Sequence, residues 1–321
     1  KANPTASSTD AKNKEKIMKS ISKRIISFAL SVFMLICVSI NLSAFESEYQ
    51  RGLAVLHSAG WSDEDISDLL TYDVVCGYAG LKLVNTNQTY YRVTEDSSEP
   101  ITKEECLADL TASDSALYIP SGNPMISPLA HGDTWKNEVT TTDGYLTYFV
   151  QVYDAGSGIY VISGRYEWLA IPSTTLTDIF AIGCEQHLQP NGPIGSEELG
   201  LYYIYKYDAL KINGRFTYEE TIPDTINIDG KGIAVSQKLA SPEFRQPVTD
   251  HRGFLQYKAI IDSTSSFGST TNASAYYIHQ KKSVSITPSI DFTGIISASI
   301  DLGTKYQLMS PNPYVLFLLS E

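Results

Sequence analysis

Apolar and polar residues alternate along most of the chain beyond residue 143, in short runs that are separated by turn-forming residues. Successive side chains of a strand point to opposite faces, so this alternation predicts strands that differ in polarity between their two faces. Many short strands with no long helical segment among them are typical of a mainly β protein. We expect an antiparallel β-sandwich, of the jelly-roll or immunoglobulin-like type, with an open barrel as the alternative. The expected strands lie within residues 144–171, 177–184, 199–210, 214–222, 231–239, 253–262, 274–280, 282–290, 294–302 and 312–319.

The first of these segments contains a hairpin signal at residues 154–158, DAGSG, between two β-rich runs. In the second run Tyr160 and Ile162 fall on one face of the strand, whereas Arg165 and Glu167 fall on the other.

Helix signals gather before residue 118. Residues 47–58 repeat apolar side chains at helical spacing. Ser62 is placed to cap a helix that Asp65 supports three residues later, and Thr102 with Glu105 repeats this spacing before a second short helix.

These patterns divide the chain into two regions. Residues 45–118 form a small, mostly helical N-terminal region in which only residues 90–93, YYRV, are β-like. Residues 119–321 form the β-sandwich domain, which begins with a linker rich in Pro and Gly at residues 119–133.

Residues 18–44 have the three parts of a secretory signal peptide: a basic start, an uncharged apolar run, and small residues before Ala44. We expect cleavage after Ala44. The alternative is an uncleaved signal anchor, because the apolar run reaches the lower limit of a membrane-spanning helix. Residues 1–17 precede the first Met and are interpreted as an untranslated leader or a disordered segment. The predicted location is extracellular.

The charge of the chain is strongly negative. Residues 1–44 hold 7 of the 24 basic and 2 of the 36 acidic side chains, so the chain beyond them has a net charge of −17. Nucleic acids and anionic membranes repel such a protein, and we expect neither as a partner. No apolar segment after Leu42 is long enough to span a bilayer, so no stable membrane span is expected after signal cleavage.

Three cysteines follow the predicted signal peptide: Cys76, Cys106 and Cys184. An odd and sparse set does not form a disulfide framework. The sequence allows a disulfide bridge between Cys76 and Cys106, and it equally allows free thiols at both positions.

Several stretches carry a resemblance that covers about Gly60 to Val315: GWSDEDISDLLTYD, GDTW, DGYLTYFVQVYD, SGRYEWLAIP, YYIYKYDA, RGFLQYKAII and SPNPYV. On these stretches the chain resembles a group of uncharacterised secreted proteins of clostridial and related Gram-positive bacteria. The resemblance implies a bacterial extracellular protein. It implies no activity and no functional residues.

Two clusters with metal-binding or catalytic residue types have simpler structural interpretations. Cys184 and His187, in CEQH, are suited to a zinc site or a nucleophile pair, but two further ligands are missing and Cys184 fits a buried strand. His131 and Asp133, in AHGDTW, are suited to acid–base chemistry, but a turn at Gly132 explains them equally well. We predict no metal site and no cofactor.

Carboxylates suited to glycoside cleavage are present, but the sequence does not show which two face each other. Residues 224–232, DTINIDGKG, resemble a calcium loop, yet their ligand spacing departs from that of an EF-hand and favours a hairpin turn at Asp229-Gly230. Nucleophile-elbow, phosphate-loop and zinc-protease motifs are absent from the sequence, which therefore gives no positive support for an enzyme. The candidate acids are Asp154, Glu167, Glu197, Glu198, Glu219 and Glu220.

The chain is tyrosine-rich, with 21 tyrosines, and Tyr203, Tyr205 and Tyr207 share one strand face. With Tyr276 and Trp168 they are our predicted binding residues, because aromatic rings stack on sugars and on partner proteins. The alternative is cross-strand packing, since Tyr is a good strand former. We therefore expect a secreted binding or surface-interaction protein for an extracellular glycan or protein. The alternative is a secreted hydrolase whose carboxylate pair the sequence does not identify.

Overall fold

The computed structural model describes residues 46–94, 97–116, 144–170, 175–211, 214–241, 248–281 and 306–320. The described chain forms two compact units, residues 46–56 with 71–79 and residues 57–70 with 80–320. No helix in these described ranges is both long and apolar enough to cross a membrane. Several predicted features lie outside the described residues: the leader at 1–17, the signal peptide at 18–44, the linker at 119–133 with His131 and Asp133, and the strands at 282–290 and 294–302.

The first unit pairs the helical residues 46–56 with α3 (Tyr72–Gly77). A Cβ atom on Gly52 would lie 1.9 Å from the carbonyl oxygen of Val75, so glycine is what allows the two helices to approach this closely. Tyr49 and Tyr72 stack across the same contact, with ring centroids 4.7 Å apart.

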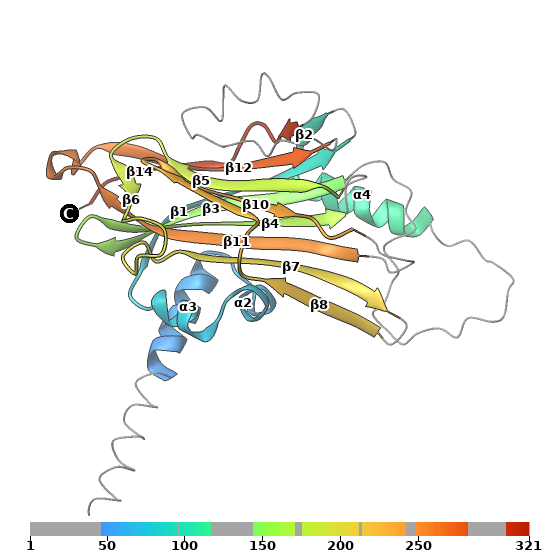
Figure 1. Cartoon of the computed structure of the whole chain (residues 1–321), viewed down its shortest axis with the longest axis horizontal. Coiled ribbons are helices and arrows are strands. Elements are labelled where there is room, and N and C mark those ends of the chain that lie inside the picture. The colour runs from blue at the N-terminus through green and yellow to red at the C-terminus, as the bar shows by residue number, and fades with distance from the viewer. Residues whose placement is uncertain are drawn as a thin grey trace, which may run out of the picture. The chain divides into compact units, whose positions relative to one another are not determined.

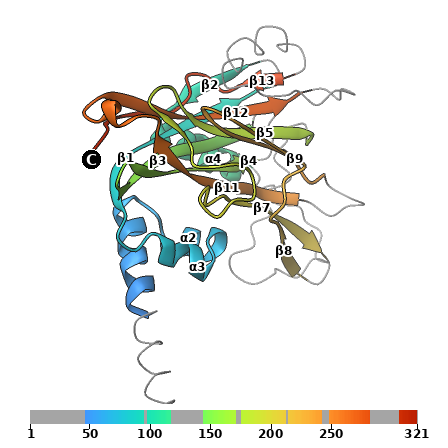
Figure 2. The same ribbon diagram turned by 60° about the vertical axis from the view of Figure 1, so that its left-hand side comes forward.

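The second unit is built on two antiparallel sheets, which Figures 1 and 2 show as two layers. In the described residues, sheet A has the spatial order β2 (Ser98–Ile101), β1 (Lys82–Val93), β3 (Gly144–Gly156), β4 (Ile159–Ala170), β11 (Val248–Ile261), β7 (Tyr202–Lys211) and β8 (Gly214–Glu220), with β6 (Leu188–Pro190) paired to the end of β11. Sheet B has the order β13 (Tyr306–Leu308), β12 (Thr270–Gln280), β5 (Thr177–Cys184), β10 (Gly232–Lys238) and β9 (Thr225–Asp229), with β14 (Tyr314–Leu318) paired to the first half of β12. The predicted antiparallel sandwich is confirmed.

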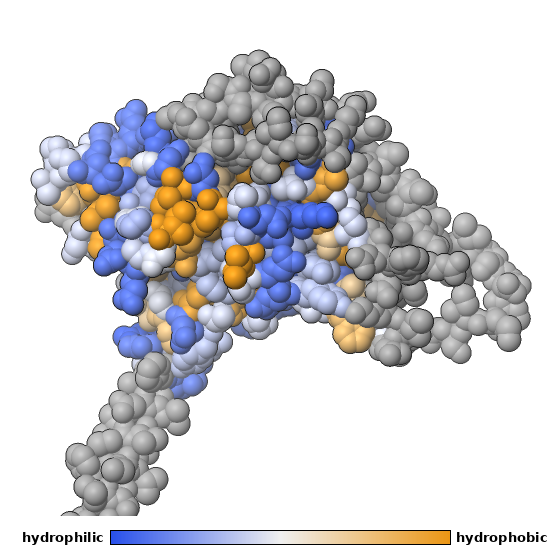
Figure 3. All heavy atoms as spheres, in the orientation of Figure 1, coloured by the Kyte–Doolittle hydropathy of each residue, from blue (hydrophilic) through white to orange (hydrophobic). Residues whose placement is uncertain are grey.

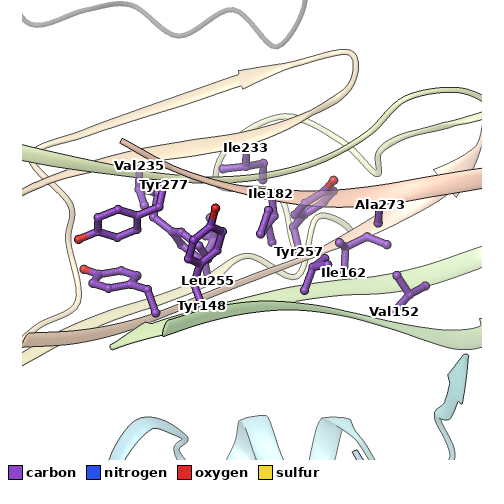
Figure 4. Close-up of a cluster of buried hydrophobic side chains, with 14 of the residues drawn as sticks. Tyr148, Val152, Ile162, Ile182, Ile233, Val235, Leu255, Tyr257, Ala273 and Tyr277 are labelled. Atoms are coloured by element: carbon purple, nitrogen blue, oxygen red, sulfur yellow. The ribbon is translucent and has the colours of Figure 1, made fainter. Parts of the chain in front are cut away.

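Alternating side chains from both sheets meet in one core (Figure 4). Ile162 and Leu255 of sheet A and Ile182 and Tyr277 of sheet B are fully buried there. A Cβ atom on Gly164 would lie 2.8 Å from side-chain atoms of Ile182 and Phe180, so this glycine lets the sheets approach closely. Burial of this alternating apolar surface is the main term that stabilises the sandwich.

Both predicted hairpins are confirmed. β3 and β4 are joined at Ser157 and Gly158, whose φ angles of 55° and 73° are the two positive values that a tight hairpin turn requires. β9 and β10 are joined after Asp229, whose carboxylate accepts hydrogen bonds from the backbone of Lys231 (2.7 Å) and Gly232 (3.2 Å). These two hydrogen bonds show that Asp229 stabilises the hairpin turn.

Both predicted capping arrangements are also present. The N–H of Asp65 donates to Ser62 Oγ (3.1 Å) at the start of α2 (Asp63–Leu69). The N–H of Glu105 donates to Thr102 Oγ1 (3.1 Å), and the N–H of Thr102 donates to Glu105 Oε2 (2.8 Å), before α4 (Lys103–Ala116). A single turn of 3₁₀-helix, η1 (Thr264–Ser266), follows β11.

The strand content before residue 118 is larger than predicted. The β-like run at residues 90–93 is the end of β1, a strand of 12 residues that pairs with β3 along its whole length. Four consecutive polar residues, 85–88, are exposed in its middle. This part of β1 lies near the edge of sheet A, where side chains are exposed to water and can be polar. The polar run therefore lacks the apolar alternation by which a strand is recognised in a sequence.

Candidate functional site

The predicted tyrosine row lies on the inner face of β7. Tyr203 is 5% exposed and Tyr205 is 0% exposed. The hydroxyl of Tyr203 donates to Gln237 Oε1 (2.9 Å), and that of Tyr205 is hydrogen-bonded to Nδ1 of His251 (2.7 Å). Burial raises the pKa of both phenols. These two side chains offer no ring face to a ligand, and cross-strand packing accounts for them.

Tyr207, at the end of this row, is half-buried. Its ring stacks on that of Tyr218 of β8, with centroids 5.1 Å apart and planes at 9°. Tyr207 and Tyr218 lie directly opposite each other on β7 and β8, and the packing of their rings stabilises the pairing of the two strands.

Trp168 is 1% exposed and belongs to a polar cluster inside the core. Its indole N–H donates to the Tyr277 hydroxyl (2.9 Å), which in turn donates to Asp178 Oδ2 (2.6 Å). Nδ1 of His279 lies 2.8 Å from Asp178 Oδ1. Because β4, β5 and β12 supply these groups, the cluster joins the two sheets. The ring of Trp168 is not exposed, so the structure adds no support for a binding role, which stays a prediction.

The residues of CEQH do not converge on one site. Cys184 is buried on the inner face of β5, and burial raises the pKa of its thiol to about 12, which opposes a thiolate. Nδ1 of His187 is instead 3.1 Å from Ser266 Oγ, which donates to Asp262 (2.9 Å). Cys76, Cys106 and Cys184 are all free thiols. Within the described ranges, no three His, Cys, Asp or Glu side chains are grouped so that they could hold a metal ion.

Four of the candidate carboxylates each have a donor of their own. Asp154 accepts from Ser320 Oγ (2.6 Å), Glu167 pairs with Arg165 (2.7 Å), Glu219 pairs with Lys206 (2.9 Å), and Glu220 accepts from Gln237 (2.6 Å). Glu197 and Glu198 are exposed in the turns before β7. Glycoside cleavage requires two carboxyl groups that face the same substrate, whereas these four carboxylates are each bound to a separate donor.

The most exposed row of large apolar side chains in the described residues lies on β14. Val315 and Phe317 point into the core, whereas Tyr314, Leu316 and Leu318 alternate with them and are 52%, 55% and 63% exposed. We call these three exposed side chains the β14 face. Strand geometry places them side by side, because every second residue of a strand projects from the same face.

Two asparagines of β1 hold the outer edge of β14. Asn85 Nδ2 donates to the carbonyl oxygen of Leu316 (3.1 Å), and Asn87 Nδ2 donates to that of Tyr314 (2.9 Å). The order of the contacts is antiparallel, so the two amides take the place of a neighbouring strand and join sheet A to sheet B. Both asparagines are exposed. We call this pair of contacts the asparagine seam.

The other side of β14 is paired with β12, where Thr270, Asn272 and Ser274 lie opposite Leu318, Leu316 and Tyr314. All three are uncharged. Tyr276 follows Ser274 on the same face and is half-buried, and burial raises the pKa of its phenol. Of the five predicted binding residues, Tyr276 is the one that shares a sheet face with the β14 face.

The sequence contains a signal for the β14 face. The run YVLFL is apolar at every position, so a strand there must expose apolar side chains unless both its faces are covered. The asparagine seam has no such signal, since its partners are more than 200 residues apart, at separations of 231 and 227.

Comparison with known proteins gives distant structural similarity and no family. No protein-family model matches the chain, and no curated protein matches it in sequence. One structural match is to the T6 backbone pilin of serotype M6 Streptococcus pyogenes, which is described as having a modular three-domain structure decorated with variable loops and extensions. The identity is 10%, the TM-score is 0.25, and the match covers 73% of this chain and 61% of the pilin chain. The resemblance to clostridial secreted proteins stays a prediction.

Proposed function

We propose that this protein is an extracellular binding module that contacts a glycan or protein through the β14 face. The observation that carries the proposal is the exposure of Tyr314, Leu316 and Leu318, each more than half accessible, on one face of one strand.

Single apolar residues are normal on protein surfaces, and Figure 3 shows small apolar patches between hydrophilic residues on one face of this molecule. The β14 face differs because three large side chains stand in register on a strand that is held on both sides. Fully burying a leucine side chain gains about 1.5–3 kcal/mol, and each of these side chains retains roughly half of that for a partner. A rigid strand also loses little conformational entropy on binding.

The test compares two triple variants with the unmodified protein. In the first, Tyr314, Leu316 and Leu318 are changed to Ala. In the matched control, the exposed apolar residues Ile194, Phe216 and Ile222 are changed to Ala. Each protein is applied to arrays of immobilised polysaccharides and of extracellular-matrix proteins, and its thermal unfolding midpoint is measured to confirm the fold.

We expect the unmodified protein and the control variant to bind the same ligand, and the β14 variant to lose at least tenfold in affinity with little change in unfolding midpoint. Equal binding by both variants contradicts the proposal. Failure of the unmodified protein to bind any ligand on either array contradicts it as well.

A further inference from the structure

We infer that the asparagine seam makes the β14 face a site for an uncharged polysaccharide. This inference rests on the proposed function and names its ligand class.

The first argument is the hydrogen-bonding capacity that remains in the seam. A side-chain amide nitrogen carries two N–H groups and an amide oxygen accepts two hydrogen bonds. Asn85 and Asn87 each use one N–H on β14, and the oxygen of Asn85 accepts from the backbone N–H of Thr86 (2.9 Å). Each amide therefore keeps a second N–H, and the oxygen of Asn87 has no hydrogen-bond partner within the described part of the chain. Both side chains are exposed, so these groups are accessible to a ligand.

The second argument is the fixed position of these amides. An exposed asparagine normally rotates among several conformers, and ordering it costs binding free energy. Here the carbonyl oxygens of Tyr314 and Leu316 already hold both side chains. The amides lie two residues apart along β1, which places a repeated donor pattern beside the strand. Such a pattern suits a ligand with repeated hydroxyl groups.

The third argument is the combination of an apolar face with polar edges. The C–H face of a sugar ring packs on the phenol ring of Tyr314 and on the two leucines, while the sugar hydroxyls reach the amides at the edge. A protein partner would cover the leucines equally well. It would leave the remaining amide N–H groups unsatisfied unless its own polar groups matched them, and burying an unpaired polar group is costly.

The fourth argument is charge. Seven residues of β1 and β12 that flank the β14 face are uncharged: Asn85, Thr86, Asn87, Gln88, Thr270, Asn272 and Ser274. The chain as a whole carries a net charge of −12. An anionic polysaccharide would meet long-range repulsion with no cation among these seven residues to offset it, whereas an uncharged one meets none.

The test uses affinity electrophoresis in gels that contain a named polymer. Laminarin, mannan and galactomannan are the uncharged probes, and hyaluronan and polygalacturonate are the anionic ones. The proteins are the unmodified chain, the double variant Asn85→Ala/Asn87→Ala, the single variant Asn87→Gln, and the control Asn191→Ala. Asn191 is a matched control because its Nδ2 also donates to a backbone carbonyl, that of Glu198 (3.2 Å), in the connection between β6 and β7.

We expect at least one uncharged polymer to retard the unmodified protein and Asn191→Ala, and the anionic polymers to retard neither. The double variant should bind at least tenfold more weakly. Because loss of both amides removes two contacts of the fold, Asn87→Gln gives an independent reading: it keeps an amide, moves it by one methylene, and should lose affinity with an unchanged unfolding midpoint.

The outcomes separate this inference from the proposed function. Retardation that is equal in all four proteins, or retardation by anionic polymers only, overturns the inference. If a protein ligand binds through Tyr314, Leu316 and Leu318 while no uncharged polymer binds, the inference fails and the proposed function stands. If changing the β14 face alters no binding at all, both fail.

Discussion

The indole N–H of Trp61 donates to the side-chain oxygen of Gln151, 2.9 Å away, and so fastens the residues before α2 to the outer face of sheet A. The Trp61 ring meets Phe149 and Phe254 edge to face, with centroids 5.7 and 5.4 Å apart. Gln151 is itself held, because its Nε2 donates to the carbonyl oxygen of Ala59 (2.8 Å). One tryptophan therefore secures a helical segment to two strands by apolar contact and by a buried hydrogen bond.

Replacing Trp61 tests this attachment. We expect Trp61→Ala to lower the free energy of unfolding by about 3–5 kcal/mol, because a large buried ring is removed and a cavity remains. Trp61→Phe keeps most of the ring and should lose only about 1–2 kcal/mol, since the Tyr153 hydroxyl still donates to Gln151 Oε1 (2.7 Å). Urea denaturation followed by circular dichroism measures both. Equal losses in the two variants would show that ring packing is not the main contribution.

His251 predicts a pH dependence of stability. It is fully buried, and burial lowers the pKa of its imidazole to about 4, from an ordinary value near 6.5. The unfolded chain therefore takes up this proton at a higher pH than the folded chain does. The contribution of neutral His251 to stability is complete above pH 6.5, falls as the pH drops from about 6.5 to about 4, and changes no further below that. The total loss is roughly 3 kcal/mol.

The variant His251→Asn isolates this effect, because asparagine does not titrate and its amide can take the place of Nδ1 in the hydrogen bond with the Tyr205 hydroxyl. Urea midpoints measured between pH 7.5 and pH 4 should fall more steeply for the unmodified protein than for the variant. Parallel curves would mean that the carboxylates alone determine the acid response.

Gly164 predicts a steric limit on the spacing of the sheets. We expect Gly164→Ala to destabilise the protein by about 1–3 kcal/mol or more, because its methyl group would lie 2.8 Å from Ile182 and Phe180 and 3.0 Å from the Phe149 carbonyl oxygen. Gly230→Ala is the matched control, since a Cβ atom there meets nothing within 4 Å. Differential scanning calorimetry should show a lower midpoint for the first variant and little change for the second.

Asn272 predicts a stabilising substitution. Its Oδ1 is buried without a hydrogen-bond partner in the described residues, opposite Leu316. Asn272→Val removes that acceptor and introduces a β-branched residue that suits a strand, so we expect a gain of about 1 kcal/mol. Thr217→Val, at an exposed position of β8, controls for the introduction of valine into a strand. A lower thermal midpoint for Asn272→Val would mean that the amide stabilises the fold through its nitrogen.

The sequence predicted those parts of the fold whose signals are local. The bounds of β5 follow from the short apolar run in TDIFAIGC, and the start of α2 follows from Ser62 and Asp65. The middle of β1 was missed because residues 85–88 are polar and exposed. Alternation also showed that Tyr203, Tyr205 and Tyr207 share a face, but not which face meets the other sheet, because that depends on packing between distant segments. The asparagine seam depends on the same long-range packing.

The asparagine seam also bears on the order of folding. Asn85 and Asn87 are more than 200 residues away from their partners along the chain, at separations of 231 and 227. A contact of such long range closes only after the intervening strands have paired, because the entropy of the enclosed loop opposes it until then. The amides of Asn85 and Asn87 thus stay hydrated while the intervening strands pair, and their contacts with β14 form late in the folding of the unit.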